Sequence, residues 1–216
     1  MPKLSSEQQE IRRARILDAA EMCFANNGFH RSTMQDICRR AGISAGALYI
    51  YFDSKEALIE GISARNREDV LSAFSQLSDM PDFQSGLELL LQQCILNQPE
   101  HKSRLWLDIG AEATRNDRIK QTIENCDHLI LSAMTQLLEG AQQQGLIDPV
   151  LPVSSIAEAM AAMADGLFWR SAIAPHFDAA TIGRTMLAML AGVLRPVPAG
   201  DSQQSDKDIT LVETLS

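Results

Sequence analysis

The feature that most constrains the fold of this chain is its helical periodicity. Apolar residues recur about every 3.6 positions through most of the 216 residues, and no stretch alternates apolar and polar residues as a half-buried strand does. Apolar stripes of this kind are buried when helices pack against one another. Glycine and proline interrupt the pattern often enough to divide it into about nine helices. We therefore predict an all-α fold.

The breaks and the capping residues give the approximate limits of each helix. Gly28 and Gly42 each follow an apolar periodic segment and can end a helix, whereas Thr33, Ser44 and Ser54 are suited to begin one. We expect helices at about residues 10–27, 34–41, 45–49, 55–77, 83–97, 103–114, 118–144, 153–173 and 178–195. Periodicity ends beyond Pro196, and the polar composition of residues 197–216 predicts a flexible acidic tail.

The segment from Thr33 to Tyr49 predicts a helix-turn-helix. It holds two short helices joined by a tight turn at Gly42, where glycine permits a positive φ and lets the helices cross steeply. Small apolar residues on both sides of the turn, Ile37 and Ile43 among them, can hold that angle. In such a motif the second helix enters the major groove of DNA. The three helices up to about residue 49 therefore form a compact head.

The same region resembles the DNA-binding head of TetR-type transcriptional regulators. The resemblance covers about 45 residues without a gap, and its landmarks are Ile16-Leu17-Asp18-Ala19-Ala20, Phe24, Gly28-Phe29, Ser32 to Ile37, Ala41 to Ser44 and Leu48 to Leu58. It implies a helix-turn-helix domain at 1–55, followed by a ligand-binding and dimerisation domain at 56–196. It also implies a repressor that binds a palindromic operator as a homodimer and is released by a small-molecule effector.

The resemblance also implies which residues lie at the DNA face. They are Thr33, Gln35, Ser44, Ala45, Gly46, Ala47, Tyr49, Tyr51 and Lys55, and Ile50 adds an apolar contact. The second helix carries few polar side chains, which allows close approach and contact with thymine methyl groups. Base hydrogen bonds then fall mainly to Gln35, which can pair bidentately with adenine. Tyr49, Tyr51 and Lys55 suit phosphate contacts.

Charge is distributed unevenly along the chain. The formal net charge is −9, yet residues 1–55 hold eight Lys and Arg against six Asp and Glu, a net charge of +2, which leaves −11 for the rest. A mildly basic N-terminal part on an acidic body is consistent with a nucleic-acid-binding head.

The last two predicted helices suit a dimer interface. Their apolar stripes are Ile156, Met160, Met163 and Leu167 on one and Ile182, Met186, Met189, Leu190 and Val193 on the other. Two such helices from each subunit would form a four-helix bundle. The alternative is that these stripes belong to the core of the subunit.

The remaining helices could enclose a cavity for a lipophilic effector. The aromatic, thioether and acidic candidates for its lining are Trp106, Asp108, Glu112, His128, Met134, Met163, Phe168 and Trp169. Ordinary core packing, with solvated acids, is the alternative for each of them.

Several classes of protein are disfavoured. The chain has no apolar run of 18 residues and no signal peptide, which argues against a membrane protein. Its four cysteines, Cys23, Cys38, Cys94 and Cys126, are too widely spaced for a zinc site or disulfide framework, which favours a reducing cytoplasm. No catalytic motif or phosphate-binding glycine loop is present, so we expect no cofactor and no enzyme activity. An all-α enzyme and a helical adaptor without DNA binding remain the alternatives.

Overall fold

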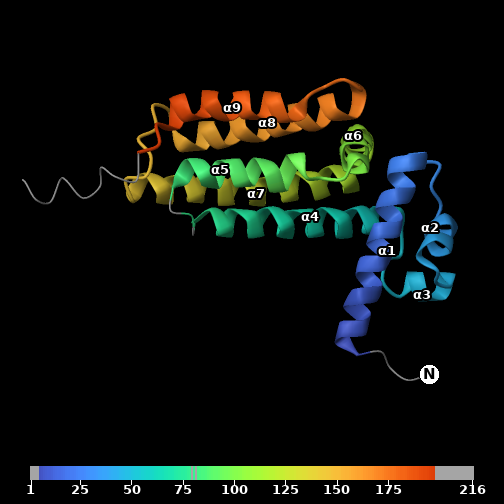
Figure 1. Ribbon diagram of the computed structural model, residues 1–216. Coiled ribbons are helices and arrows are strands. Elements are labelled where there is room, and N and C mark those ends of the chain that lie inside the picture. Colours follow the sequence, from blue (N-terminus) through green and yellow to red (C-terminus); the bar gives the residue numbers. More distant parts are fainter. Residues whose placement is uncertain (1–4, 79, 81, 198–216) are drawn as a thin grey trace, which may run out of the picture. The chain divides into compact units, whose positions relative to one another are not determined.

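The computed structural model describes residues 5–78, 80 and 82–197, so the predicted tail beyond Val197 lies outside the described residues. These residues form nine α-helices and one π-helical turn, with no strand among them, which confirms the all-α prediction (Figure 1). The elements are α1 (Ser6–Asn27), α2 (Met34–Ala41), α3 (Ala45–Tyr49), α4 (Lys55–Ser78), α5 (Phe83–Leu91), η1 (Gln92–Leu96), α6 (Glu100–Ala113), α7 (Asp117–Gln143), α8 (Val153–Ile173) and α9 (Ala179–Leu194).

Three helix limits differ from the prediction by three residues or more. Helix α1 begins four residues earlier, because Ser5 and Gln8 form a capping box in which each side chain accepts a hydrogen bond from the other residue's backbone N–H. Helix α6 begins at Glu100, directly after Pro99. The helix expected over 83–97 is α-helical only to Leu91 and continues as the π-helical turn η1.

The chain divides into two compact units. The first unit joins the described residues up to Asp69 with residues 98–129 and 168–177. Its core draws on α1 to α4, α6 and α7, and its fully buried side chains include Ile16, Leu17, Phe24, Ile37, Leu48, Leu58, Ile59, Ile62, Leu105, Ile109 and Ile119. The core that supports the helix-turn-helix thus extends past residue 55, the predicted boundary of the head, into α4, α6 and α7.

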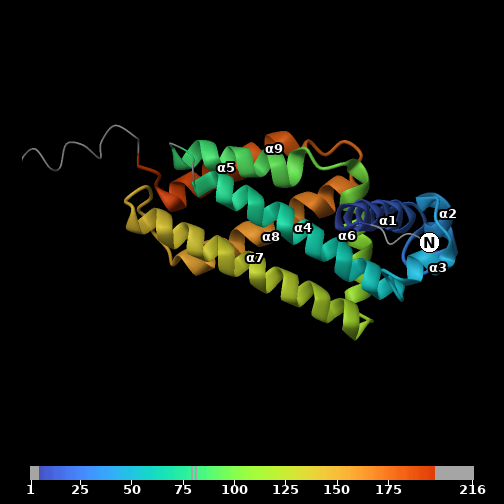
Figure 2. The ribbon, with the colours of Figure 1, turned by 90° about the horizontal axis from the view of Figure 1, so that it is seen from below.

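The second unit comprises residues 70–97, 130–167 and those from 178 onward. Its core contains Phe74, Leu77, Phe83, Leu87, Leu138, Ile147, Ile156, Leu190 and Leu194. Helices α5 and α9 pack closely in this unit (Figure 2). A Cβ on Gly183 of α9 would lie only 3.0 Å from two carbons of Leu91 of α5, so glycine is what permits this approach.

No α-helix within the described residues has an apolar stretch long enough to cross a membrane. The same residues contain no group of three or more His, Cys, Asp or Glu side chains arranged to hold a metal ion.

Candidate nucleic-acid interface

The turn between α2 and α3 has the geometry that the sequence predicts. Gly42 adopts the left-handed conformation, with φ 64° and ψ 40°, and ends α2. Ser44 then caps α3, and its hydroxyl accepts a hydrogen bond from the backbone N–H of Ala47 at 3.2 Å. From α1, the Arg15 Nε donates to the carbonyl oxygen of Ala41 at 3.1 Å, next to the turn. This cation at the C-terminus of α2 was not predicted, because its partner lies 26 residues away.

Helix α3 is anchored by one residue and presents the others outward. Leu48 is fully buried in the first core, whereas Ser44, Ala45 and Gly46 are exposed. A Cβ built on Gly46 meets no atom within 4 Å, so this side of the helix faces open space. The exposed face of α3 is therefore small and nearly free of polar side chains.

Two large side chains follow this face at the end of α3. Tyr49 is 54% exposed and Ile50 is 80% exposed. Ala47 and Tyr51 are half-buried, and Tyr51 packs against the first core. An isoleucine this exposed beside an exposed tyrosine is an apolar surface that a partner can cover.

The start of α2 holds two further predicted contact residues, Thr33 and Gln35, both exposed. Thr33 and Asp36 form a second capping box. The Thr33 hydroxyl accepts from the backbone N–H of Asp36 and donates to the Asp36 carboxylate at 2.6 Å, so this hydroxyl is already engaged. These bonds from Thr33 hold the pKa of Asp36 below its usual value. Arg39 pairs with the same carboxylate. Gln35 makes no hydrogen bond with any of the described residues, so its amide is available to a partner.

Lys55 is half-buried and is used within the unit. Its Nζ donates a hydrogen bond to the carbonyl oxygen of Phe29 at 2.6 Å and lies 4.2 Å from the centre of the Phe29 ring. The prediction treated this ammonium as a phosphate contact. An ammonium has three N–H donors, so the Phe29 contact fixes the position of the side chain and leaves donors for a second partner.

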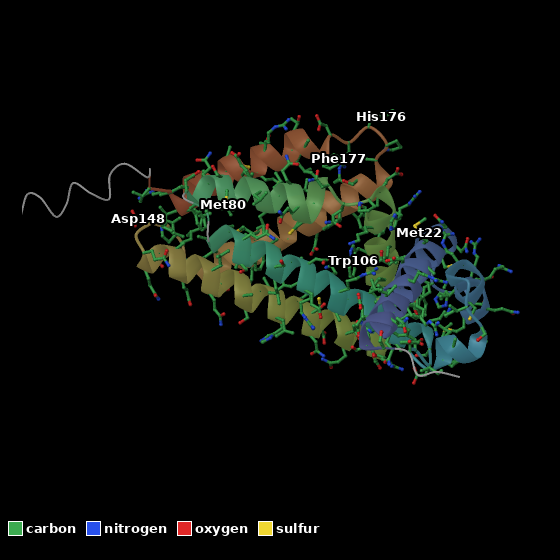
Figure 3. All side chains as sticks on the ribbon, turned by 60° about the horizontal axis from the view of Figure 1, so that its bottom comes forward. Met22, Met80, Trp106, Asp148, His176 and Phe177 are labelled. Carbon is green, nitrogen blue, oxygen red and sulfur yellow. The ribbon has the colours of Figure 1, made fainter. Side chains whose placement is uncertain are left out.

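Helix α6 also contacts the segment that contains Phe29 and His30. The Asp108 carboxylate accepts a hydrogen bond from the backbone N–H of Phe29 at 2.7 Å, and Glu112 lies 2.7 Å from His30 Nε2. Trp106, labelled in Figure 3, packs against the first core. These three residues of α6 were predicted to line an effector cavity, whereas Asp108 and Glu112 contact the segment that precedes the helix-turn-helix and Trp106 packs against the first core.

The other predicted effector residues have varied surroundings. Met134 is buried in the second core and Met163 packs against it. In the first unit Phe168 is half-buried, whereas His128 and Trp169 are exposed. The eight predicted residues are thus divided between the two units.

The predicted dimer residues divide into buried and exposed sets. Ile156, Met160, Leu167 and Leu190 are at most 9% exposed within the single chain, so they pack the interior of the subunit and do not present a face. Ile182 and Met189 are exposed on α9, and Met186, Val193 and Met163 are half-buried. Sequence could not separate the two sets, because an apolar stripe has the same periodicity whether it faces its own core or a partner.

Two protein-family models match the chain. Residues 16–62 match the model described as bacterial regulatory proteins of the tetR family. Residues 85–195 match the C-terminal model described as the BetI-type transcriptional repressor. The first match covers the helix-turn-helix, and the second covers about half of the chain.

Similar proteins give the same result. The chain is 28% identical over 196 residues to the HTH-type transcriptional regulator UidR of Escherichia coli, an alignment that covers 90% of this chain and 98% of UidR. It resembles the solved structure of Salmonella enterica GusR, with a TM-score of 0.71 and 29% identity, over 90% of this chain and 100% of that one. The transcriptional regulator FadR from Bacillus subtilis, solved in complex with stearoyl-CoA, shares the fold at 20% identity, with a TM-score of 0.70 over 82% and 96% of the two chains. The chain is therefore a member of the TetR family of bacterial transcriptional regulators, and its function is to regulate transcription by binding DNA.

Proposed function

We propose that the chain is a homodimeric repressor that binds a palindromic operator through α3 and leaves it when a small molecule binds. Each half-site would take one head, as in other dimeric helix-turn-helix proteins. A repressor of this kind acts by binding alone, without catalysis, in the cytoplasm where bacterial DNA lies.

The observation that carries this proposal is the exposed surface of α3. Its first residues are small and open to approach, and Tyr49 and Ile50 protrude directly after them. A major groove admits a helix whose contact face is narrow, and apolar side chains there can meet thymine methyl groups. Few base hydrogen bonds are available, so DNA shape and deformability would add to specificity.

Binding to DNA from the region upstream of the chain's own gene tests the proposal. We expect a labelled duplex from that region to shift on titration with protein, and a random duplex to compete poorly. Ile50→Ala and Tyr49→Ala should each weaken the specific shift while helicity stays unchanged by circular dichroism. Leu129→Ala, at an exposed leucine of α7, is the control and should bind as the wild type does. Equal competition by random duplexes would contradict operator recognition.

The dimer would use the exposed face of α9. Ile182, Met186, Met189 and Val193 recur at helical spacing and are exposed or half-buried, and Met189 is 65% exposed. Met189→Glu should convert a dimer to a monomer in light-scattering measurements and lower operator affinity. Leu129→Glu is again the matched control. A monomeric wild type at micromolar concentration would contradict this part of the proposal.

An effector is supported by the stearoyl-CoA complex of FadR, which shares the fold. Release of DNA requires that the effector bind the free conformation more tightly than the DNA-bound one. Screening small molecules for loss of the DNA shift identifies the effector, and a compound that binds without changing the shift is not one.

A further inference from the structure

A surface groove lies between α4 and α7 in the first unit. It has a volume of about 460 Å³ and is lined by Glu60, Ser63, Ala64, Arg67, Arg118, Gln121, Thr122, Asn125 and Cys126. All nine residues belong to the same compact unit. None of them is among the residues predicted from sequence to bind an effector. The volume is in the range of sites that bind small molecules.

The base of the groove contains a hydroxyl group without a partner. Ser63 is 2% exposed, and its Oγ makes no hydrogen bond with any residue that the structure describes. Buried polar atoms are nearly always paired, because leaving one unpaired is costly. Ser63 also lines the groove, so a ligand lying there could pair with this hydroxyl.

Two guanidinium groups stand at the same groove. Arg118 Nε pairs with Glu60 at 2.7 Å. Arg67 is half-buried, and it makes no hydrogen bond or ion pair with any of the described residues. The two arginines and Glu60 give the lining one net positive charge. Cys126 adds no negative charge at neutral pH, because burial raises the pKa of its thiol.

We propose that this groove binds a small organic carboxylate. The carboxylate pairs with the Arg67 guanidinium, whose planar donors match its two oxygens. The Ser63 hydroxyl donates to the ligand, and the amide and hydroxyl groups of Gln121, Thr122 and Asn125 accept or donate to its other polar groups. Ala64 and the methylene stems of the arginines give it an apolar surface.

Titration calorimetry on the full-length protein tests this proposal with three probes. The first is mandelate, which combines a carboxylate, a hydroxyl and an apolar ring. Mandelamide is its neutral counterpart, and inorganic phosphate is an anion without an apolar part. We expect mandelate to bind, mandelamide to bind at least about tenfold more weakly, and phosphate to bind more weakly than mandelate. Binding of phosphate but not mandelate, or no binding of mandelate, would overturn the assignment.

Variants connect the binding to this groove. Arg67→Gln should weaken mandelate binding at least about tenfold, as expected for loss of a charge-assisted hydrogen bond, and Arg67→Lys should restore part of it. Arg184→Gln, at an exposed arginine of α9, is the matched control and should leave the affinity unchanged. Equal affinity in Arg67→Gln and wild type would show that mandelate binds elsewhere, which contradicts the proposal.

Ser63→Ala separates a binding role from a structural one. Removing an unpaired buried hydroxyl should raise the melting temperature of the free protein. If the hydroxyl also donates to the ligand, the same variant binds mandelate several-fold more weakly. A higher melting temperature with unchanged affinity would show that Ser63 does not contact the ligand and would overturn its part in the site.

Discussion

Substitution of Gly46 tests directly whether α3 approaches DNA closely. Gly46 is exposed in the first turn of α3, and a Cβ built there meets nothing within 4 Å, so a side chain at this position begins in open space. Leucine also has the higher helix propensity. In an exposed first turn we expect a gain of about 0.5 kcal/mol in the free energy of unfolding, at the low end of the glycine penalty. The variant should thus be at least as stable as the wild type.

The effect on DNA binding should have the opposite sign. If the backbone at Gly46 lies against the groove, a four-carbon side chain has to displace the DNA. A cost of about 1.4 kcal/mol per half-site is a factor of ten, and two half-sites of a palindrome give about 2.8 kcal/mol, or a hundredfold. Fluorescence anisotropy with operator DNA measures this loss, and thermal unfolding followed by circular dichroism measures the stability.

The control for this experiment is Gly110→Leu. Gly110 is an exposed glycine of α6 whose added Cβ also meets nothing within 4 Å, so the two substitutions are alike in the free protein. We expect Gly110→Leu to bind operator as the wild type does. If Gly46→Leu also binds within twofold of wild type, α3 does not pack its small face against DNA, and the reasoning is refuted.

Three further substitutions test other contacts of the structure. Asp36→Ala removes the carboxylate half of the capping box of α2 and keeps the bond from the backbone N–H of residue 36 to the Thr33 hydroxyl. Because folding lowers the pKa of Asp36, the contribution of the carboxylate is present at pH 7 and is lost as the pH falls through that lowered pKa. The difference in urea unfolding between variant and wild type should therefore be largest at pH 7 and shrink as the pH is lowered. Lys55→Met removes the hydrogen bond to Phe29 and should lower the free energy of unfolding by about 1–2 kcal/mol. Lys55→Arg should recover part of this loss. An unchanged urea midpoint in Lys55→Met would show that the ammonium contributes nothing to stability. Gly183→Ala brings a methyl group to 3.0 Å from Leu91 and should lower the free energy of unfolding by about 1–3 kcal/mol. The control is Gly192→Ala in the same helix, where the added methyl group meets open space and should not destabilise the protein. Similar melting temperatures for the two variants would contradict the close packing of α5 and α9.

Local signals in the sequence predicted most of the fold. Capping residues such as Thr33 and Ser44, and the break at Gly42, act on backbone groups within a few positions, so their effects can be read without knowing the tertiary structure. The early start of α1 at Ser6 is also a local effect, since Ser5 and Gln8 form a capping box, as Thr33 and Asp36 do at the start of α2. The serine and glutamine three residues apart are a signal that the sequence itself contains.

Contacts between distant residues could not be predicted in the same way. Arg15 reaches Ala41, Lys55 reaches Phe29, and Asp108 reaches Phe29 across 79 positions of the chain. A carboxylate on an amphipathic helix predicts solvent exposure or a ligand equally well, and only the packing of α6 shows that Asp108 meets a backbone N–H. The same applies to Ser63, whose unpaired hydroxyl becomes apparent only when α7 covers α4.

The fastening of α6 to Phe29 and His30 limits how this regulator can be re-engineered. Grafting a foreign reading head by cutting after residue 55 would remove the partners of Asp108 and Glu112 and leave a buried carboxylate without its donors. It would also remove the N-terminal side chains that pack against Leu105, Ile109 and Ile119 in the first core. A transplant that respects the packing has to carry residues 98–129 together with the N-terminal helices. The exchangeable cassette of this protein is therefore discontinuous in sequence.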